Sequence, residues 1–529
     1  MGVFENALNR QQERLQALAA LDPHCLAGGL IGLEKECLRV APDGTISQHP
    51  HPTVLGSALT HPWITTDFSE ALLELITPPL AGVPVALDRL REIQAYVYRH
   101  LGGEILWATS MPCVLAGETN IPIAEYGSSN EGRMKHVYRV GLGHRYGRVM
   151  QVIAGVHFNY SLPDHFWPLY AQVTGHVGPD RHLIDESYMA LVRNLQRFGW
   201  LVPYLFGASP AVCKSFFGGQ GTDMPVFDEG TYFEPYATSL RLGDIGYQNQ
   251  HEAKIGTRIN YATLADYVSS LKYAIETPAA EWEALGVNVN GDWRQLNANL
   301  LQIENEYYSS VRPKQLLNGL EKPIQALRRR GIRYVELRSP DIDAFHAEGM
   351  DEKQLHFLEA FMVFCVLMDS RPLGTREIRE IDLNFQRVAH QGRKPGLMLA
   401  RGGGEVPLRV WASQILEGMS GICETLDAGT GRQVYATALL GQVVKVQDSA
   451  ATPSARMLAE MRDRGESFYE FARRRSREYQ VYFNGVEIEG ARVAELDDEA
   501  AASLRRQQDI EDATNTSFGE FLADYLAGD

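Results

Sequence analysis

The sequence predicts an α+β protein with an antiparallel or mixed sheet. Four separate segments alternate between apolar and polar residues as strands do, and long helical segments lie between them. The regular strand–helix alternation of a doubly wound fold is missing. With 529 residues, 45% of them hydrophobic and 22% charged, the chain corresponds to about three domains, or to one large enzyme domain with appendages.

Helices are predicted where apolar residues recur at a spacing of 3.6. The first 21 residues form an amphipathic helix that carries charges throughout, which is unlike a signal peptide. Further helices are expected over 85–101, ended by two glycines, over 262–276, and over 352–368, which is apolar on nearly all sides. The connection 164–240 is expected to be rich in loops. From about residue 452 the chain is charged and helical, so we expect a catalytic domain over 1–452 and a helical extension over 453–529.

The four strand-like segments hold the residues of chemical interest. They are 28–40, 63–78, 149–163 and 332–341. The segment 63–78 fits either a bent hairpin or a helix.

Charge and cysteine usage restrict the partners and the compartment. The chain has 50 Lys and Arg against 66 Asp and Glu, a net charge of −16, so it lacks the basic field of a nucleic-acid-binding or membrane-surface protein. Its most apolar stretch, 200–212, contains two prolines and is too short to span a bilayer. The cysteines show no metal-binding spacing and predict scattered, reduced thiols in a cytoplasmic protein. They are Cys25, Cys37, Cys113, Cys213, Cys365 and Cys423.

Glu34 and Glu36 lie two residues apart in LEKECL, so a strand would point both carboxylates to the same face. A solvent-facing edge is the simpler interpretation of such a pair. The apolar residues around them instead favour a covered sheet, in which two carboxylates need a compensating cation. Mg²⁺ takes oxygen ligands and is the natural partner.

The segment 63–78 repeats this pattern with Asp67 and Glu74. A hairpin would bring the two carboxylates together across its strands, and a helix would bring them together at a spacing of seven residues. The pair is therefore expected to be close in either case. Glu70 is expected at a turn or on the surface.

The other two segments add a histidine and an acid–guanidinium pair. His157 and Asn159 share one strand face, although a single strand histidine is more often a hydrogen-bonded core residue. Glu336 and Arg338 also share a face. A structural ion pair explains the second pattern equally well, but an acid beside a guanidinium also suits a site that holds metal and phosphate together.

The chain lacks several common catalytic motifs. It contains no GxxxxGK[ST], no GxGxxG after a strand, no GxSxG and no HExxH. Four apolar strands that together place acids and a histidine on one face favour metal-dependent phosphoryl chemistry.

Long phrases of the chain closely resemble the glutamate–cysteine ligases found in many proteobacteria. They include GLEKECLRV, LTHPWITTDFSEALLELITP, YGSSNEGRMKHVYRVGLGHRYG, GVHFNYSLP, YATSLRLGDIGY, LQIENEYYSSVRPK and YVELRSPDI. The similarity is collinear over about residues 25–400 and weaker beyond them. It implies a curved, largely antiparallel sheet with flanking helices, like the catalytic core of glutamine synthetase.

The resemblance also implies an activity, the first step of glutathione biosynthesis. ATP activates the γ-carboxylate of glutamate as an acyl phosphate, and the amine of cysteine attacks it. The implied cofactor is Mg²⁺, with Mn²⁺ as a substitute, and ATP is a co-substrate. Feedback inhibition by glutathione is expected as well. The alternatives are a related ligase with another amine acceptor and a non-catalytic metal-binding protein.

The resemblance assigns roles to individual residues. Arg338 resembles a phosphate contact and Arg241 a contact to a substrate carboxylate. The side chains that resemble the walls of a cysteine pocket are Tyr138, Tyr247, Tyr308 and Phe68. Those that resemble metal ligands are Glu34, Glu36, Asp67, Glu74, His157 and Glu336.

Overall fold

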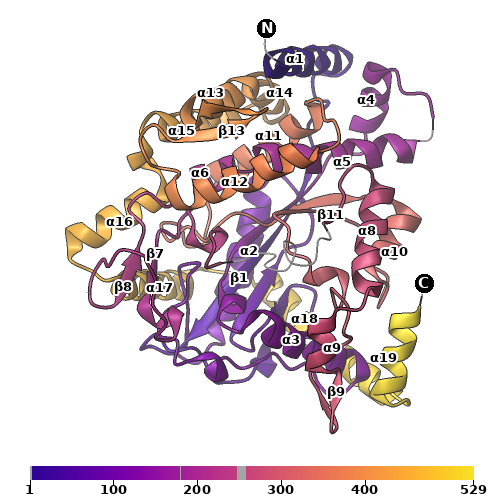
Figure 1. Ribbon diagram of the computed structural model, residues 1–529, viewed down its shortest axis with the longest axis vertical. Coiled ribbons are helices and arrows are strands. Elements are labelled where there is room, and N and C mark those ends of the chain that lie inside the picture. The colour runs from indigo at the N-terminus through magenta and orange to yellow at the C-terminus, as the bar shows by residue number, and fades with distance from the viewer. Residues whose placement is uncertain (1–2, 179, 247–257, 529) are drawn as a thin grey trace.

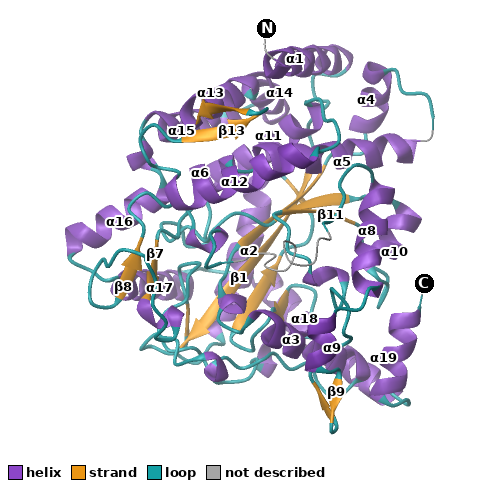
Figure 2. Cartoon of the chain, viewed as in Figure 1, coloured by secondary structure: helices purple, strands orange, loops and turns teal. Residues whose placement is uncertain are grey.

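The computed structural model describes residues 3–178, 180–246 and 258–528, and within them the predicted α+β class is confirmed. An eight-stranded sheet crosses the middle of the molecule with helices around it (Figures 1 and 2). Its main path runs in the order β11-β12-β6-β1-β3-β2, with β4 and β5 also paired to β1, and every pairing is antiparallel. The strands are β1 Leu30–Val40, β2 Ile64–Thr66, β3 Leu72–Ile76, β4 Leu80–Ala81, β5 Ile105–Leu106, β6 Val156–Ser161, β11 Val311–Lys314 and β12 Tyr334–Leu337.

Three two-stranded ribbons lie outside this sheet. They are β7 Ala211–Cys213 with β8 Thr231–Phe233, β9 Asn288–Val289 with β10 Asp292–Trp293, and β13 Met398–Arg401 with β14 Gly404–Pro407.

The helices predicted from periodicity are present with small shifts at their ends. Side chains at their N-termini accept backbone N–H groups, as Thr263 does for α8 and Asp351 for α11. The helices before residue 452 are α1 Val3–Leu21, α2 Val83–Arg99, α3 Asn130–Tyr146, α4 Phe166–Thr174, α5 Asp180–Phe198, α6 Leu201–Phe206, α8 Leu264–Glu276, α9 Ala280–Leu285, α10 Pro323–Arg330, α11 Glu352–Leu367, α12 Thr375–Gln391, α13 Leu408–Gly418, α14 Ser420–Thr430 and α15 Val434–Gln447. Those of the C-terminal part are α16 Pro453–Arg464, α17 Phe468–Gly485, α18 Gly490–Ala513 and α19 Phe518–Ala527.

Two predictions about secondary structure need correction. The connection 164–240 is not mainly loop, because its first part forms α4, α5 and α6, and α5 buries an apolar stripe that the prolines and glycines nearby had obscured. The segment 149–163 is a strand only over β6, since a 3₁₀ turn at Met150–Val152 precedes it. The segment 63–78 is the hairpin β2–β3.

Helices α2 and α11 cover the face of the sheet opposite to the acidic side chains. Lys35 points to this covered face, where its Nζ donates to Gln94 Oε1 at 2.9 Å and to the Ala347 carbonyl at 3.1 Å. Glu359 of α11 lies in the same layer and accepts a hydrogen bond of 2.7 Å from the Tyr435 hydroxyl. The alternation of side chains in β1 therefore separates a structural face from a face that carries Glu34 and Glu36.

The expectation of six reduced thiols is wrong for one pair. Cys113 and Cys213 form a disulfide with their Cα atoms 5.4 Å apart, while the other four cysteines are free and buried. The two partners are 100 residues apart in the chain. Only the packing of β7 beside the segment that follows β5 brings them together, so no local spacing could reveal the pair.

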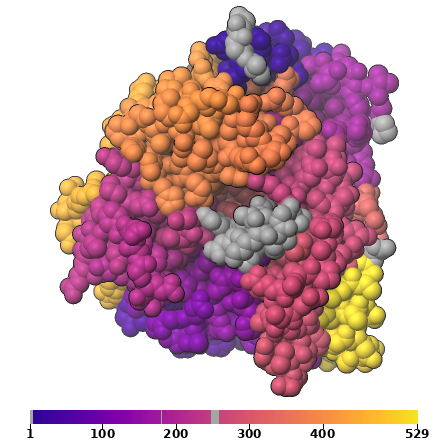
Figure 3. Space-filling model, in the orientation of Figure 1, coloured from indigo at the N-terminus to yellow at the C-terminus, as the bar shows by residue number. Residues whose placement is uncertain are grey.

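The C-terminal helices pack against parts of the chain that precede them by more than 200 residues. The Tyr96 hydroxyl of α2 donates to Asp497 of α18 at 2.8 Å. Trp293 and Phe518 of α19 form an edge-to-face ring pair with centroids 4.9 Å apart, and Figure 3 shows the yellow C-terminal residues beside this red part of the chain. The domain boundary at 452/453 stays a prediction. Among the described residues, no helix is at once long and apolar enough to cross a membrane.

Candidate active site

The register of the central strands places the acidic side chains on one face of the sheet. Glu34 of β1 lies directly opposite His157 of β6, and Glu36 lies opposite Glu74 of β3. Glu336 of β12 lies opposite Asn159, the next residue of β6 on that face. Because directly opposed residues of antiparallel strands project to the same side, this register alone collects these side chains.

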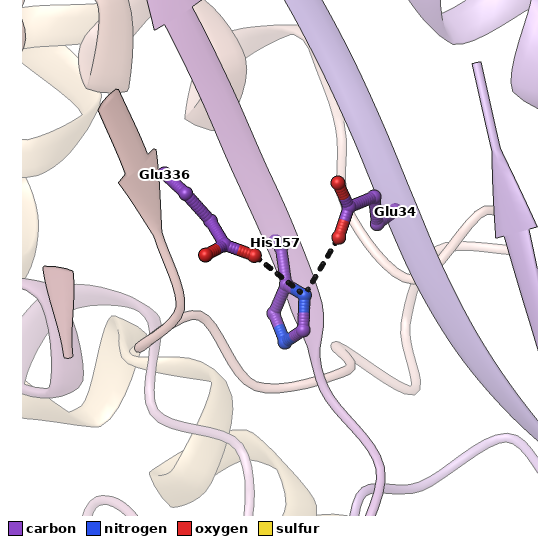
Figure 4. Close-up of side chains that lie close together, drawn as sticks. All are labelled: Glu34, His157 and Glu336. Carbon is purple, nitrogen blue, oxygen red and sulfur yellow. Dashed lines mark hydrogen bonds and ion pairs between the residues drawn. The ribbon is translucent and has the colours of Figure 1, made fainter. Parts of the chain in front are cut away.

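His157 is at the centre of this acidic cluster. Its Nδ1 lies 3.1 Å from Glu34 Oε2 and 3.6 Å from Glu336 Oε1, and its Nε2 lies 3.6 Å from Glu36 Oε1. Figure 4 shows the imidazole between the carboxylates of Glu34 and Glu336. One donor atom from each of these three residues lies within 4.8 Å of the others, an arrangement that could hold a metal ion.

Asp67 and Glu74 reach the same face from the hairpin. Asp67 directly follows β2, and its backbone N–H donates to the Leu72 carbonyl at 2.9 Å, which closes the turn. Burial and the nearby charges of Glu34, Asp67 and Glu36 raise the pKa of Glu74 well above its usual value. All six carboxylate and histidine side chains named from the sequence therefore lie together.

The pKa shifts differ between the two sides of the cluster: they are upward for Glu36 and Glu74 and downward for Glu34 and Glu336. Burial raises the pKa of the Glu36 carboxyl, against a smaller lowering effect of His157. Burial also acts to raise the pKa of Glu34, but the hydrogen bond from His157 outweighs it, and the pKa is lowered. In Glu336 the charges of Lys314 and Arg338 outweigh burial and bring the pKa well below its usual range.

Cations border the Glu336 end of the cluster. Arg338 Nη1 donates to Glu336 Oε1 at 2.9 Å, and Lys314 Nζ lies 3.3 Å from Glu336 Oε2. Arg312 is paired with Glu336 in the β11–β12 register and so shares its face. Acids thus dominate on β1 and β3, and cations on β11 and beside β12. Such a face can hold divalent cations and phosphate groups next to one another.

Arg241 is buried at the end of β12. Its Nη2 donates to the Arg338 carbonyl at 2.9 Å, and its Nη1 lies 3.5 Å from Asp341 Oδ1. The Asp341 carboxylate in turn accepts hydrogen bonds from the Ser209 and Ser239 hydroxyls at 2.7 and 2.9 Å. This arrangement holds the guanidinium beside the acidic cluster.

The aromatic residues assigned by resemblance are in different environments. Tyr138 of α3 and Tyr308 are half-buried, and burial raises the pKa of both hydroxyls; the charge of Arg312, which lies near both, opposes this rise in part. Phe68 is 1% exposed and lies within the core at the hairpin turn. Tyr247 lies outside the described residues. Whether these side chains form one pocket stays a prediction.

The sequence interpretation missed several residues of this face. Arg312 and Lys314 alternate in VRPK, but Pro313 between them is untypical of a strand interior; it is tolerated because β11 is the edge strand. Asn159 Nδ2 donates to Glu34 Oε1 at 2.9 Å. Glu70 was expected at a turn or on the surface; it lies in the turn, but it is buried and accepts backbone N–H groups from His51 and Glu125, both at 2.7 Å.

Comparison with known proteins identifies the family of the chain that carries this face. The family model described as "Glutamate-cysteine ligase" matches residues 15–388, which is more than half of the chain. The chain belongs to the glutamate–cysteine ligase family. The matched residues include every strand of the large sheet and every residue of the acidic cluster.

Individual members of the family are similar over nearly their whole length. The chain is 46% identical to the glutamate–cysteine ligase of Pseudomonas aeruginosa, covering 99% of this chain and 98% of the relative. It is 44% identical to that of Alcanivorax borkumensis, covering 97% and 99%. A crystal structure of the Francisella tularensis enzyme in complex with AMP is 34% identical, with a TM-score of 0.88 and coverage of 94% and 98%.

Proposed function

We propose that this protein catalyses the ATP-dependent ligation of the γ-carboxylate of glutamate to the amine of cysteine, the first step of glutathione biosynthesis. The observation that carries the proposal is the sheet face on which buried carboxylates adjoin cations. The chain matches the model of this ligase family over residues 15–388 and a member of the family over 99% of its length. The AMP bound to the Francisella enzyme supports an adenine nucleotide as the co-substrate.

The metal sites are the first part of the proposal. Glu34, Glu36, Asp67, Glu74, His157 and Glu336 are proposed to hold Mg²⁺, or Mn²⁺ in its place. Their donor set fits, because it consists of carboxylate oxygens and one imidazole, and because buried carboxylates at this density need cations to stay ionised. When bound, the cations offset the negative charge of the transferred phosphoryl group.

Phosphate binding is proposed for the cations at the other end of the face. Arg338 presents a planar fork that matches phosphate oxygens, and its contact with Glu336 Oε1 fixes its orientation. Lys314 and Arg312 add positive charge from the neighbouring strand. These residues would stabilise charge that develops as the terminal phosphoryl group moves to glutamate.

Recognition of the two amino acids is proposed for the residues beside this face. Arg241 would bind a carboxylate of glutamate from its position at the end of β12. Tyr138, Tyr308 and Phe68, with Tyr247, would surround the short side chain of cysteine. The thiol is recognised in this scheme and does not react.

The reaction then needs no nucleophile from the protein. A carboxylate is a poor electrophile, so phosphorylation by ATP gives an acyl phosphate, which the cysteine amine attacks with release of phosphate. In the first step an oxygen of the γ-carboxylate forms a bond to the terminal phosphorus of ATP, and the bond from that phosphorus to ADP breaks. In the second step the amine nitrogen forms the amide bond and loses a proton, while the acyl C–O bond breaks, so that the former carboxylate oxygen leaves with the phosphate. The proposed compartment is the cytoplasm, and glutathione is proposed as a feedback inhibitor.

The test is an ADP-release assay with glutamate and a panel of amines. We expect release with cysteine and, less efficiently, with 2-aminobutyrate, in which a methyl group replaces the thiol. Lysine and bulky amino acids should be inactive because their charge or size does not fit a small pocket. Release with cysteine but with no sulfur-free analogue would contradict the mechanism. A preference for ammonia or polyamines would move the assignment to a ligase with another amine acceptor.

A further inference from the structure

The last helix of the chain, α19, packs onto α3, the helix that carries Tyr138. Figure 1 shows α19, in yellow, on the same side of the molecule as α3 and α9. Its ten residues lie outside the range 15–388 that the family model matches, and none of them belongs to the acidic cluster. Phe518 and Leu522 lie one helical turn apart on its buried side, and each is 3% exposed.

The partners of this buried side come from α3 and from the segment 293–303. The buried members of the shared apolar cluster are Met134, Val137, Leu296, Phe518 and Leu522. Tyr138, Trp293 and Ile303 are partly buried and pack against this cluster. Met134 precedes Tyr138 by one helical turn, so both side chains lie on the same side of α3. The apolar side of α19 therefore contacts α3 along the turn that ends in Tyr138.

Hydrogen bonds attach both ends of α19 to earlier parts of the chain. Asn130 Nδ2, at the first residue of α3, donates to the Thr516 carbonyl at 3.0 Å, just before α19 begins. Lys322 Nζ, just before α10, donates to the Leu526 carbonyl at 3.0 Å and to the Gly528 carbonyl at 2.5 Å. The position of α19 relative to α3 is therefore fixed at both ends of the helix.

The side of α3 that carries Arg139 faces the acidic cluster. Arg139 Nε donates to the carbonyl of Asp67, at the turn of the hairpin. Burial raises the pKa of the Tyr138 hydroxyl, and the charges of Arg312 and Asp67 also act on it. Tyr138 thus lies between the apolar cluster formed with α19 and the groups of the candidate active site.

We propose that α19 is a positioning element for the amino-acid acceptor, because it holds α3 so that the Tyr138 side chain is in place before cysteine binds. A side chain that is already ordered loses less conformational freedom when the ligand binds, which increases the affinity. Phe518 and Leu522 touch no substrate in this scheme and are positioning residues. The inference rests on the proposed function, which assigns Tyr138 to the cysteine pocket.

The test displaces α19 in the full-length protein. Phe518→Asp/Leu522→Asp places two carboxylates in the apolar cluster, where unpaired charges are strongly unfavourable. Gly519→Asp/Ala523→Asp is the matched control, because it adds the same two charges at the same spacing on the exposed side of the same helix. Hydrogen exchange of the α19 amides measures whether the helix still contacts α3, and ADP release measures the KM of each substrate.

In Phe518→Asp/Leu522→Asp we expect fast exchange of α19 and a KM for cysteine at least tenfold above that of the wild type. The KM values for glutamate and ATP should change less than twofold, because the residues proposed to bind them lie on the sheet and at the end of β12. Phe518→Leu/Leu522→Met keeps the apolar contacts and should restore the KM for cysteine. The exposed control should behave as the wild type does.

Fast exchange of α19 with an unchanged KM for cysteine would overturn the inference, since a merely stabilising helix would give that result. Unchanged exchange would show that the apolar cluster does not hold α19 and would overturn it as well. Equal rises of all three KM values would mean a general loss of structure and contradict a positioning role. A wild-type protein that releases no ADP with cysteine would refute the proposed function itself, so the two failures are distinguishable.

Discussion

At the scale of single residues, the absence of a side chain at Gly155 leaves the space that the Arg241 guanidinium occupies. A Cβ atom on Gly155 would lie 2.0 Å from Arg241 Nη2, and the Gly155 N–H donates to Glu36 Oε2 at 2.5 Å. We expect Gly155→Ala to displace the guanidinium and to raise the KM for glutamate at least tenfold. The KM for ATP should change much less. Steady-state kinetics with each substrate varied in turn measure both values.

Gly441→Ala is the matched control for this substitution. Gly441 lies within α15, and a Cβ atom there meets no other group within 4 Å. The change should leave both KM values unaltered and stabilise the helix by about 0.5–1 kcal/mol. An unchanged KM for glutamate in Gly155→Ala would show that Arg241 does not contact this substrate.

Arg338 is expected to tolerate no replacement, because Lys presents a point charge in place of a planar fork. Arg338→Lys should lower kcat at least tenfold, which corresponds to about 1.4 kcal/mol of transition-state stabilisation. Circular dichroism should stay the same. Arg333→Lys is the control: Arg333 precedes the same strand, but it is exposed and pairs with Asp164. ATP kinetics that do not change in Arg338→Lys would leave Arg338 as a structural ion-pair partner.

At the scale of elements, the hairpin that carries Asp67 and Glu74 begins at a buried histidine. His61 Nδ1 accepts the backbone N–H groups of Trp63 and Ile64 at 3.1 and 3.0 Å. Burial lowers the pKa of His61 from 6.5 to about 4. The unfolded chain therefore binds this proton at a higher pH than the folded protein does. Folding stability should fall as the pH decreases from 6.5 towards 4.

His61→Asn should reduce this acid sensitivity, because Asn Oδ1 can accept the same N–H groups and does not titrate. The expected gain relative to wild type at pH 5, compared with pH 7.5, is up to about 2 kcal/mol at roughly 1.4 kcal/mol per pKa unit. Thermal melting at the two pH values measures it. His182→Asn, at an exposed position of α5, should have no such effect. Equal acid sensitivity of wild type and His61→Asn would exclude His61 as its source.

At the scale of the whole molecule, the disulfide between Cys113 and Cys213 closes a long loop of chain. The denatured but unreduced protein should expose four titratable thiols, and reduction should expose six. A loop of this length restricts the unfolded state, so the disulfide should stabilise the protein by up to about 4–5 kcal/mol. Dithiothreitol should therefore lower the melting temperature. Cys113→Ala/Cys213→Ala should melt at one temperature with or without the reductant. Six thiols before reduction would mean that the bridge does not form.

The acidic residues of the site could be predicted because their positions depend on a local rule. Alternation along a strand placed Glu34 with Glu36 and His157 with Asn159, whatever the partner strands are. For Asp67 and Glu74 both candidate structures gave the same proximity. Lys314 could not be predicted in this way, because Pro313 argued against a strand, and only the edge position of β11 removes that objection.

The sequence by itself determined the α+β class, the helices predicted from periodicity to within two residues at each end, and the side of each strand on which an acid lies. These follow from spacing within a short segment. The tertiary structure alone decided the order of strands that sets Glu34, His157 and Glu336 around one point. It also decided the contact of Arg241 with Asp341 and the bridge of Cys113 with Cys213. Each of these joins segments far apart in the chain, and such pairings depend on how whole surfaces pack, for which a local pattern carries no information.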